Sequence, residues 1–249
     1  MKAYREFAPP DGWATTVGCL WMLAHRPALA SEGPDRVLPD GATDIVFSFD
    51  RLLVYGPAPS FHLVGVRDYL VGIRLRAEAV RQVLGVNPAT LGLGPVPLDA
   101  LWGRDTPAVE NRLMSEPAPG KRLTLLAYFL TEHVRPNARL DSAVVTAIRC
   151  INRSPTRSVR TLTDAVHLSE RQLRRRFREH VGLGIKQYAR IIRFDRLVDA
   201  ARRHKRQFGA APPNWAALSF DHGFADQAHL TREVRTFTGL APTDLYRTL

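Results

Sequence analysis

Residues 223–235 read Gly-Phe-Ala-Asp-Gln-Ala-His-Leu-Thr-Arg-Glu-Val-Arg, which is a turn followed by a helix with two distinct faces. Leu230 and Val234 stand four residues apart, so both lie on the face that packs against the protein. The opposite face offers hydrogen-bonding and positively charged side chains. The stretch predicts a helix over about residues 227–237 that follows a tight turn and exposes its polar face.

An earlier stretch has the same organisation. A short apolar helix opens at Val159, His167 lies in the turn, and a second helix is predicted over about residues 170–180. Ser169 and Gln172 have the spacing of a capping box, which marks the start of that helix. Four arginines then follow i, i+3, i+4, i+7 spacing on one helical face.

The two stretches align at a nearly constant spacing. Trp215 stands 56 residues after Val159, and beyond the turn Leu230 stands 57 residues after Leu173. The apolar positions of one copy are therefore the apolar positions of the other. This doubling predicts two helix-turn-helix units in the last hundred or so residues.

These residues resemble the AraC/XylS family of bacterial transcription regulators, whose DNA-binding domain is two helix-turn-helix units joined by a long helix. The resemblance covers about residues 141–247 and is most specific over residues 223–235 and at Phe237, Gly239-Leu240-Ala241-Pro242 and Tyr246. The chain departs from the family pattern at three places. These are His167 in place of a turn glycine, residues 182–185 without the usual proline, and a longer connection over residues 204–213.

The resemblance implies how the two units would read DNA. Helices 170–180 and 227–237 enter successive major grooves about 34 Å apart on one side of the duplex. A connecting helix from Lys186 to about Arg203, roughly 27 Å long, sets their spacing. The residues expected to contact bases are Arg171, Arg174 and Arg175 in the first unit and Gln227, Ala228, His229, Thr231 and Arg232 in the second. The residues expected to contact phosphates are Arg178 and Arg235. Alternatives remain for two of them, because His229 can cap the helix or bind phosphate and Gln227 can serve the helix end.

Positive charge is concentrated in the half that carries the repeat. Residues 1–140 hold 15 Lys and Arg against 14 Asp and Glu, whereas residues 141–249 hold 20 against 10. Codon bias toward arginine would enrich both halves and would not align four arginines on one face. A basic domain of this kind attracts a polyanion in a salt-dependent manner.

General features of the chain exclude several classes of protein. It has 249 residues, enough for two domains, and neither a signal peptide nor an apolar stretch of membrane-spanning length is recognisable. A cytoplasmic protein is therefore expected. Cys19 and Cys150 lie in apolar surroundings and are expected to be buried, inert thiols. Nucleophile, phosphate-loop, zinc-protease and redox motifs are all missing, so we expect no enzyme, catalytic residue, cofactor or metal.

The first hundred residues differ from the rest of the chain in their pattern of apolar residues. Short β-branched and aromatic runs separated by Pro/Gly clusters predict strands over residues 15–23, 44–49, 52–55 and 70–75. Further along, a helix on this sheet, a loop and a short helix are expected over residues 77–84, 88–97 and 98–102, respectively. The order of these elements resembles the β-rich N-terminal domain of many actinobacterial AraC-type regulators.

Two helical patterns connect the halves, over residues 106–113 and 121–134. The second pattern has three interpretations, namely packing on its own sheet, linking the domains, or pairing with a second subunit. The predicted fold class is thus α+β followed by all-α. The predicted divisions are a β-rich effector-binding or dimerisation domain (1–104), a helical linker (105–140) and a DNA-binding domain (141–249).

Trp21, Asp40 and Asp44 are the candidate effector-binding residues of the N-terminal half. Structural interpretations stand beside this one. Asp40 fits a Pro-Asp-Gly turn, Asp44 the start of a strand, and Trp21, like Trp13 and Trp102, the core of the domain. Neither His25 nor His62 has neighbours in the sequence that would complete a metal site.

The expected function is sequence-specific transcription regulation. Double-stranded DNA is the expected partner, with RNA polymerase, a small-molecule effector and a second copy of the chain as further candidates, and no membrane. Activation and repression both stay open. Two other classes also stay open, a nonspecific nucleic-acid-binding protein and a regulator whose N-terminal half is an enzyme.

Overall fold

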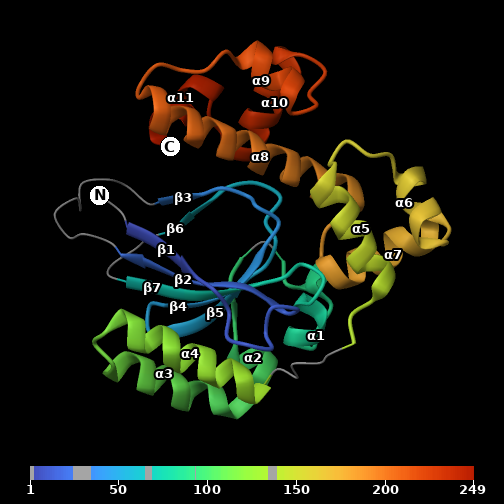
Figure 1. Ribbon diagram of the computed structural model, residues 1–249. Coiled ribbons are helices and arrows are strands. Elements are labelled where there is room, and N and C mark those ends of the chain that lie inside the picture. Colours follow the sequence, from blue (N-terminus) through green and yellow to red (C-terminus); the bar gives the residue numbers. More distant parts are fainter. Residues whose placement is uncertain (1–2, 25–34, 65–68, 93, 134–138) are drawn as a thin grey trace.

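The computed structural model describes residues 3–24, 35–64, 69–92, 94–133 and 139–249. They form an antiparallel sheet with attached helices, followed by an all-helical part (Figure 1). This is the α+β then all-α order predicted from the sequence. Among the helices of these residues, none is long and apolar enough to cross a membrane.

The main sheet has six strands in the order β1-β2-β7-β4-β5-β8, all antiparallel. Their bounds are β1 Ala3–Phe7, β2 Val17–Ala24, β4 Thr43–Ser48, β5 Arg51–Tyr55, β7 Tyr69–Leu75 and β8 Val96–Pro97. A second sheet pairs β3 (Asp35–Val37) with β6 (His62–Val64). All four predicted runs became strands, whereas the short or exposed β1, β3, β6 and β8 were missed because they lack an apolar run.

One face of the main sheet is covered by α3 (Thr106–Ser115) and α4 (Pro119–His133), as Figure 1 shows. Leu123, Leu126 and Leu130 of α4 join the buried core of the sheet. Packing on its own sheet is therefore the interpretation that the structure supports for this helix. Glu110 of α3 is also buried there, and its carboxylate accepts a hydrogen bond from the backbone N–H of Leu52 at 2.7 Å.

Short helices complete this part of the fold. They are α1 (Val80–Leu84), η2 (Pro88–Thr90), α2 (Asp99–Trp102) and η3 (Gly103–Asp105). The helix expected from residue 77 starts later, at Val80, since residues 76–79 form a turn. The loop expected over residues 88–97 contains η2 and β8, because Asn87 caps η2 and Val96 pairs with Val54 of the sheet.

The other face of the sheet carries a smaller apolar cluster of Trp21, Val46 and Leu70. Gly72 on β7 is required here, because any Cβ would collide with the indole ring of Trp21. Cys19 lies at the margin of this cluster and Cys150 at the margin of the C-terminal core, so both thiols are free and only partly buried. The expectation of fully buried cysteines was wrong for that reason, although burial still raises the pKa of Cys19 to about 11.

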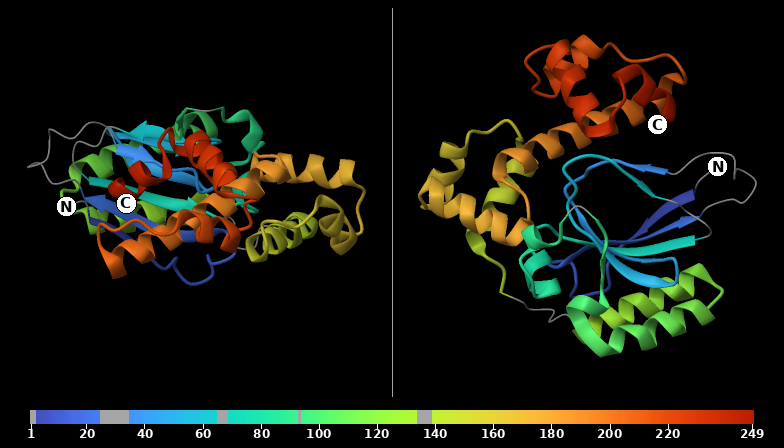
Figure 2. Two further views of the ribbon diagram at one scale, coloured as in Figure 1. Left: turned by 90° about the horizontal axis from the view of Figure 1, so that it is seen from above. Right: turned by 180° about the vertical axis from the view of Figure 1, so that it is seen from behind.

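The C-terminal part contains seven helices within residues 139–249. They are α5 Ser142–Arg153, α6 Val159–Val166, α7 Glu170–Val181, α8 Ile185–Phe208, α9 Trp215–Asp221, α10 Gln227–Thr238 and α11 Pro242–Thr248. The 24 residues of α8 correspond to a length of about 36 Å, longer than predicted because the helix continues to Phe208. One helix-turn-helix unit lies around its N-terminal end and the other along its C-terminal part (Figures 1 and 2).

Candidate nucleic-acid interface

The first unit has the predicted local chemistry. The Ser169 hydroxyl accepts a hydrogen bond from the Gln172 backbone N–H at 3.3 Å, and the Gln172 side chain accepts one from the Ser169 N–H at 3.0 Å. This is the complete capping box. His167 ends α6 with a φ of 53°, a left-handed conformation that glycine adopts more readily. The turn therefore forms despite the missing glycine.

One face of α7 is buried, and the opposite face is exposed. Leu173 and Phe177 are each 0% exposed in the core between α5 and α8. The four arginines predicted for the opposite face, Arg171, Arg174, Arg175 and Arg178, are all exposed. Arg174 pairs with Glu170 at 2.9 Å, but a pair in which both partners face solvent is worth little and does not hold the guanidinium in place. Four cations thus stand on one surface.

The second unit repeats this arrangement with different polar groups. Leu230 and Val234 are again 0% exposed, as their alignment with the first copy predicted. Asp226 caps α10 by accepting a hydrogen bond from the His229 N–H at 2.6 Å. Gln227, Ala228, Arg232 and Arg235 are exposed, whereas His229 and Thr231 are half-buried.

His229 and Thr231 already have partners inside the unit. The His229 Nδ1 accepts a hydrogen bond from the Ala225 N–H at 3.1 Å, and its ring meets the edge of Phe224. The Thr231 hydroxyl donates to the Gln227 carbonyl at 2.8 Å. His229 therefore has a structural role in the turn, one of the alternatives that the sequence left open, and its Nε2 has no hydrogen-bond partner among the described residues.

A group of charges that the sequence reasoning missed joins α10 to α8. Arg190 makes two hydrogen bonds to the buried Glu233, at 2.9 and 2.7 Å, and Arg193 reaches the same carboxylate at 3.4 Å. Arg193 also donates to the Gly223 carbonyl in the turn at 3.1 Å. The available signal was Glu233 itself, because an acidic residue on the packing face of a helix requires a buried partner.

The two units are separated by a cleft of about 400 Å³ beside the N-terminal half of α8. Four cationic side chains line it above an apolar floor, namely Arg157, Lys186, Arg190 and Arg193. Arg157 and Lys186 are exposed. Neither was predicted as a DNA contact, because both lie outside the two helix-turn-helix stretches.

The N-terminal part contacts the C-terminal ends of both candidate recognition helices. At α7, Arg81 lies 3.5 Å from Glu179, and Gly182 is so close to Pro88 that a Cβ there would come within 3.0 Å of the proline. At α10, the Phe61 N–H donates to the Phe237 carbonyl at 2.9 Å.

Arg36 completes the contact at α10. Its guanidinium donates to the Thr238 carbonyl and stacks on the Phe61 ring at 4.0 Å. The last carbonyls of a helix have no partner inside the helix and form its negative end, so an N–H group and a cation are suitable partners for them.

A model of the family described as "Helix-turn-helix domain" matches residues 162–248. This range contains both turns, α7, α8 and α10. Residues 162–248 are an AraC-type helix-turn-helix domain. The chain accordingly carries the DNA-binding domain of an AraC-type transcription regulator.

The part that precedes the AraC-type domain matches a second family model over residues 5–92, described as a domain of unknown function (DUF6597). This range begins within β1 and extends through β7 and α1 to η2. No curated protein sequence matches the chain.

Among solved structures, the chain is similar to ToxT from Vibrio cholerae. One ToxT structure has 9% sequence identity and a TM-score of 0.47, with 100% of this chain and 98% of ToxT covered. A ToxT structure with bound unsaturated fatty acid has 9% identity and a TM-score of 0.43, with 100% and 95% covered. Likeness at this level carries no argument about what this chain binds.

The three candidate effector residues of the N-terminal part lie in one cluster of hydrogen bonds and ion pairs. The Trp21 indole N–H donates to Asp44 at 2.9 Å, and Arg74 lies 3.2 Å from Asp44 and 2.8 Å from Asp40. Asp40 also accepts a hydrogen bond from the Ala42 N–H at 2.9 Å, as a turn aspartate does.

Arg74, which was not predicted, is the centre of this cluster. The two carboxylates raise its pKa despite burial, so it stays charged and neutralises them in turn. The residues described hold no group of three or more His, Cys, Asp or Glu placed to bind a metal ion. Trp13 is core, and Trp102 stacks on His133 at 4.9 Å. His25 lies outside the described residues.

Proposed function

We propose that this regulator binds its operator by inserting α7 and α10 into successive major grooves on one side of the duplex. The observation that carries the proposal is the matched burial of Leu173, Phe177, Leu230 and Val234, which turns the polar face of each helix outward. Grooves on one side of B-DNA recur about every 34 Å. The length of α8, about 36 Å, is compatible with that spacing.

Within this proposal the exposed residues divide by chemistry. Arg171, Arg174, Arg175 and Arg232 suit guanine edges, and Gln227 suits adenine. Ala228 and Thr231 suit the thymine methyl group, while His229 reads a base or phosphate only through its free Nε2. Arg178 and Arg235 bind phosphate, and we add Arg157 and Lys186 of the interunit cleft to the phosphate contacts.

The N-terminal part, in this proposal, senses a small molecule or pairs with a second copy of the chain. Its contacts with the ends of α7 and α10 support a regulatory role, because a change in the sheet domain reaches both units directly. RNA polymerase is the further partner that a regulator requires, and the cytoplasm is where such a protein acts.

Selection of DNA ligands from a random pool with the full chain tests the proposal. A specific reader exceeds its random-site affinity by about 10³ or more at physiological salt. We expect a selected site with two protected segments one helical turn apart. Substitutions Arg171→Ala and Arg232→Ala should each lower specific affinity, whereas Arg112→Ala on α3 serves as a matched control and should not.

The competing function is nonspecific nucleic-acid binding by the basic half. Equal affinity for selected and random DNA would support that function and contradict ours. A single protected segment would contradict the insertion of both helices while leaving specific binding intact.

A further inference from the structure

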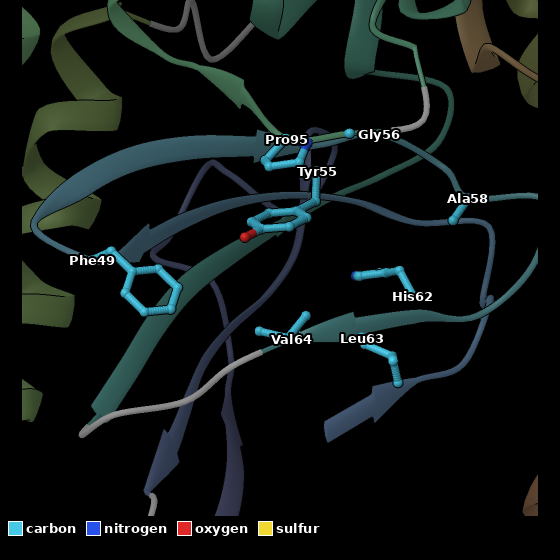
Figure 3. A pocket seen from close by; sticks show the side chains of 9 residues that line it. Phe49, Tyr55, Gly56, Ala58, His62, Leu63, Val64 and Pro95 are labelled. Atoms are coloured by element: carbon cyan, nitrogen blue, oxygen red, sulfur yellow. The ribbon is translucent and has the colours of Figure 1, made fainter. Parts of the chain in front are cut away.

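The N-terminal part contains a cavity that the three predicted effector residues do not line. It has a volume of about 180 Å³ and lies between β5, β6 and the chain at residues 94–95. Figure 3 shows the rings of Phe49, Tyr55 and His62 directed toward this common space, with Pro95 beside them. An apolar cavity of about 150 Å³ is large enough to hold benzene, so the space fits one small ring.

Among the described residues, the lining supplies two polar side chains and no charged one. Tyr55 and His62 stack with their centroids 5.7 Å apart. Within the described parts of the chain, neither the Tyr55 hydroxyl nor the His62 ring has a hydrogen-bond partner. Burial raises the pKa of Tyr55 and lowers that of His62, so both are neutral at pH 7 and each can donate or accept.

Phe49 occupies an unusual position at the edge of this space. It forms the two-residue β4–β5 turn with Asp50, at φ values of 49° and 63°. Such turns favour Asn-Gly, and a bulky residue with positive φ is an outlier. Phe49 is nevertheless 53% exposed, so packing in the core does not account for it. A strained, exposed aromatic side chain at a cavity points to a ligand that covers it.

We propose that this cavity binds a small, uncharged, planar aromatic molecule that bears one hydroxyl or similar hydrogen-bonding group. The aromatic lining contacts the ring, and Tyr55 and His62 hold the polar substituent. A carboxylate is disfavoured, because no cation among the described residues lines the space to offset its loss of hydration. A non-planar ring of the same size is disfavoured by the flat, stacked walls.

The position of His62 connects the cavity to the DNA-binding domain. The preceding residue, Phe61, donates its N–H to the Phe237 carbonyl at the end of α10. A ligand that orders β6 therefore acts one residue away from the contact with the second recognition helix. This inference rests on the proposed function for its regulatory meaning, whereas ligand binding itself does not depend on that function.

Calorimetric titration of the full chain with phenol, without DNA, tests the site. We expect saturable binding of one phenol per chain, with sodium benzoate and cyclohexanol at least tenfold weaker. The Tyr55→Phe variant removes one hydrogen bond and should weaken phenol binding about threefold to tenfold. The matched control Tyr128→Phe removes an exposed hydroxyl from α4 and should leave binding unchanged.

Filling the cavity gives a second, independent variant. The Ala58→Leu variant should abolish phenol binding. If Ala58→Leu fails to fold, the Tyr55→Phe variant still tests the proposal. The proposal would be overturned if the wild-type chain showed no saturable phenol binding. It would also be overturned if the wild-type chain bound benzoate as tightly as phenol, or if the Tyr55→Phe variant bound phenol as tightly as the wild-type chain. Affinity for the selected DNA site is measured on the same samples without phenol, so failure of the ligand site is distinguished from failure of DNA recognition.

Discussion

Arg190 and Glu233 form a two-point ion pair, at 2.9 and 2.7 Å, that fixes the second candidate recognition helix to the helix connecting the two units. Glu233 is 8% exposed and lies one helical turn from Leu230 and Phe237, so its carboxylate is anchored within the packing face of α10. A two-point contact restrains rotation as well as distance. The pair therefore adds to the apolar packing of Leu230 and Val234, which turns the polar face of α10 outward.

Glu233→Gln should lower the free energy of unfolding by about 1 to 2 kcal/mol, because Arg190 and Arg193 lose their common partner. Breaking a fully buried pair costs more, but Arg190 is 43% exposed and its charge is partly screened. Urea unfolding measures the change. The control Glu170→Gln breaks the exposed pair with Arg174 and should cost no more than about 0.5 kcal/mol. Equal losses of unfolding free energy in the two variants would show that the Arg190–Glu233 pair stabilises the chain no more than an exposed ion pair does.

The same pair contributes a pH dependence. Burial raises the pKa of Glu233, but hydrogen bonds from Arg190 and the charges of both arginines outweigh burial and lower it. The contribution to stability is therefore complete above the normal glutamate pKa and is lost as pH falls through the lowered value. The wild-type and Glu233→Gln chains should converge in stability at acid pH. A difference that persists unchanged there would contradict the ionic origin.

Arg232→Ala should cost about 1 to 3 kcal/mol of binding free energy and relax base preference at one position of the operator. Its matched control, Arg235→Ala, lies one helical turn further along the exposed face and should weaken all sequences alike. Binding to a panel of single-base operator variants separates these results. Uniform loss in Arg232→Ala would show that Arg232 contacts phosphate instead.

Residues 141–249 should fold alone and bind the selected site with nearly the salt dependence of the full chain. Twenty Lys and Arg lie in this segment, whereas residues 1–140 have a net charge of only +1. Counterion release depends on the cations that touch phosphate, so the slope of log affinity against log salt reports where they lie. A clearly steeper slope for the full chain, corrected for dimerisation, would place N-terminal residues on the DNA.

Asp195 on α8 should make the chain less stable as pH rises. Burial raises its pKa to about 6, and the negative charges of Asp199 and Asp40 add to the effect. Since the folded state holds this proton more tightly than the unfolded state, stability falls as pH rises from about 4 to 6. Asp195→Asn should be more stable by about 1 to 2 kcal/mol at pH 7.5, with the gain shrinking below pH 6. The exposed residue Asp164 provides the control variant, Asp164→Asn.

The second halves of the two helix-turn-helix units were predictable because their signals are local. A capping box at Ser169 and apolar residues four apart determine α7 whatever the rest of the chain does. The helix α5 has equally local signals, the N-cap Asp141 followed by Val144, Ala147 and Ile148, and could have been found in the same way. The small strands β3 and β6 have none, since each is three residues long and pairs only with the other.

Only part of the Trp21, Asp40, Asp44 and Arg74 cluster could be predicted from the sequence. Trp21, Asp40 and Asp44 were expected as a group, yet the binding partner of both carboxylates, Arg74, lies 30 residues further along the chain on β7. Its neighbours depend on the strand order β7-β4, which no local pattern specifies. The contact between Arg36 and Thr238 spans 202 positions and depends on how two separately formed parts dock.

Arg36→Ala should release the C-terminal end of α10 from the sheet domain. The variant loses the hydrogen bond to the Thr238 carbonyl and the stacking of the guanidinium on Phe61, while the Phe61 N–H bond to Phe237 remains. Hydrogen exchange of the full chain should therefore quicken severalfold for amides at the end of α10 and in β3 and β6, and stay unchanged in α7. Arg81→Ala is the matched variant at the other unit, because Arg81 pairs with Glu179 near the end of α7, and it should show the reverse pattern. If neither variant alters exchange at either helix end, the N-terminal part does not hold the recognition helices in solution.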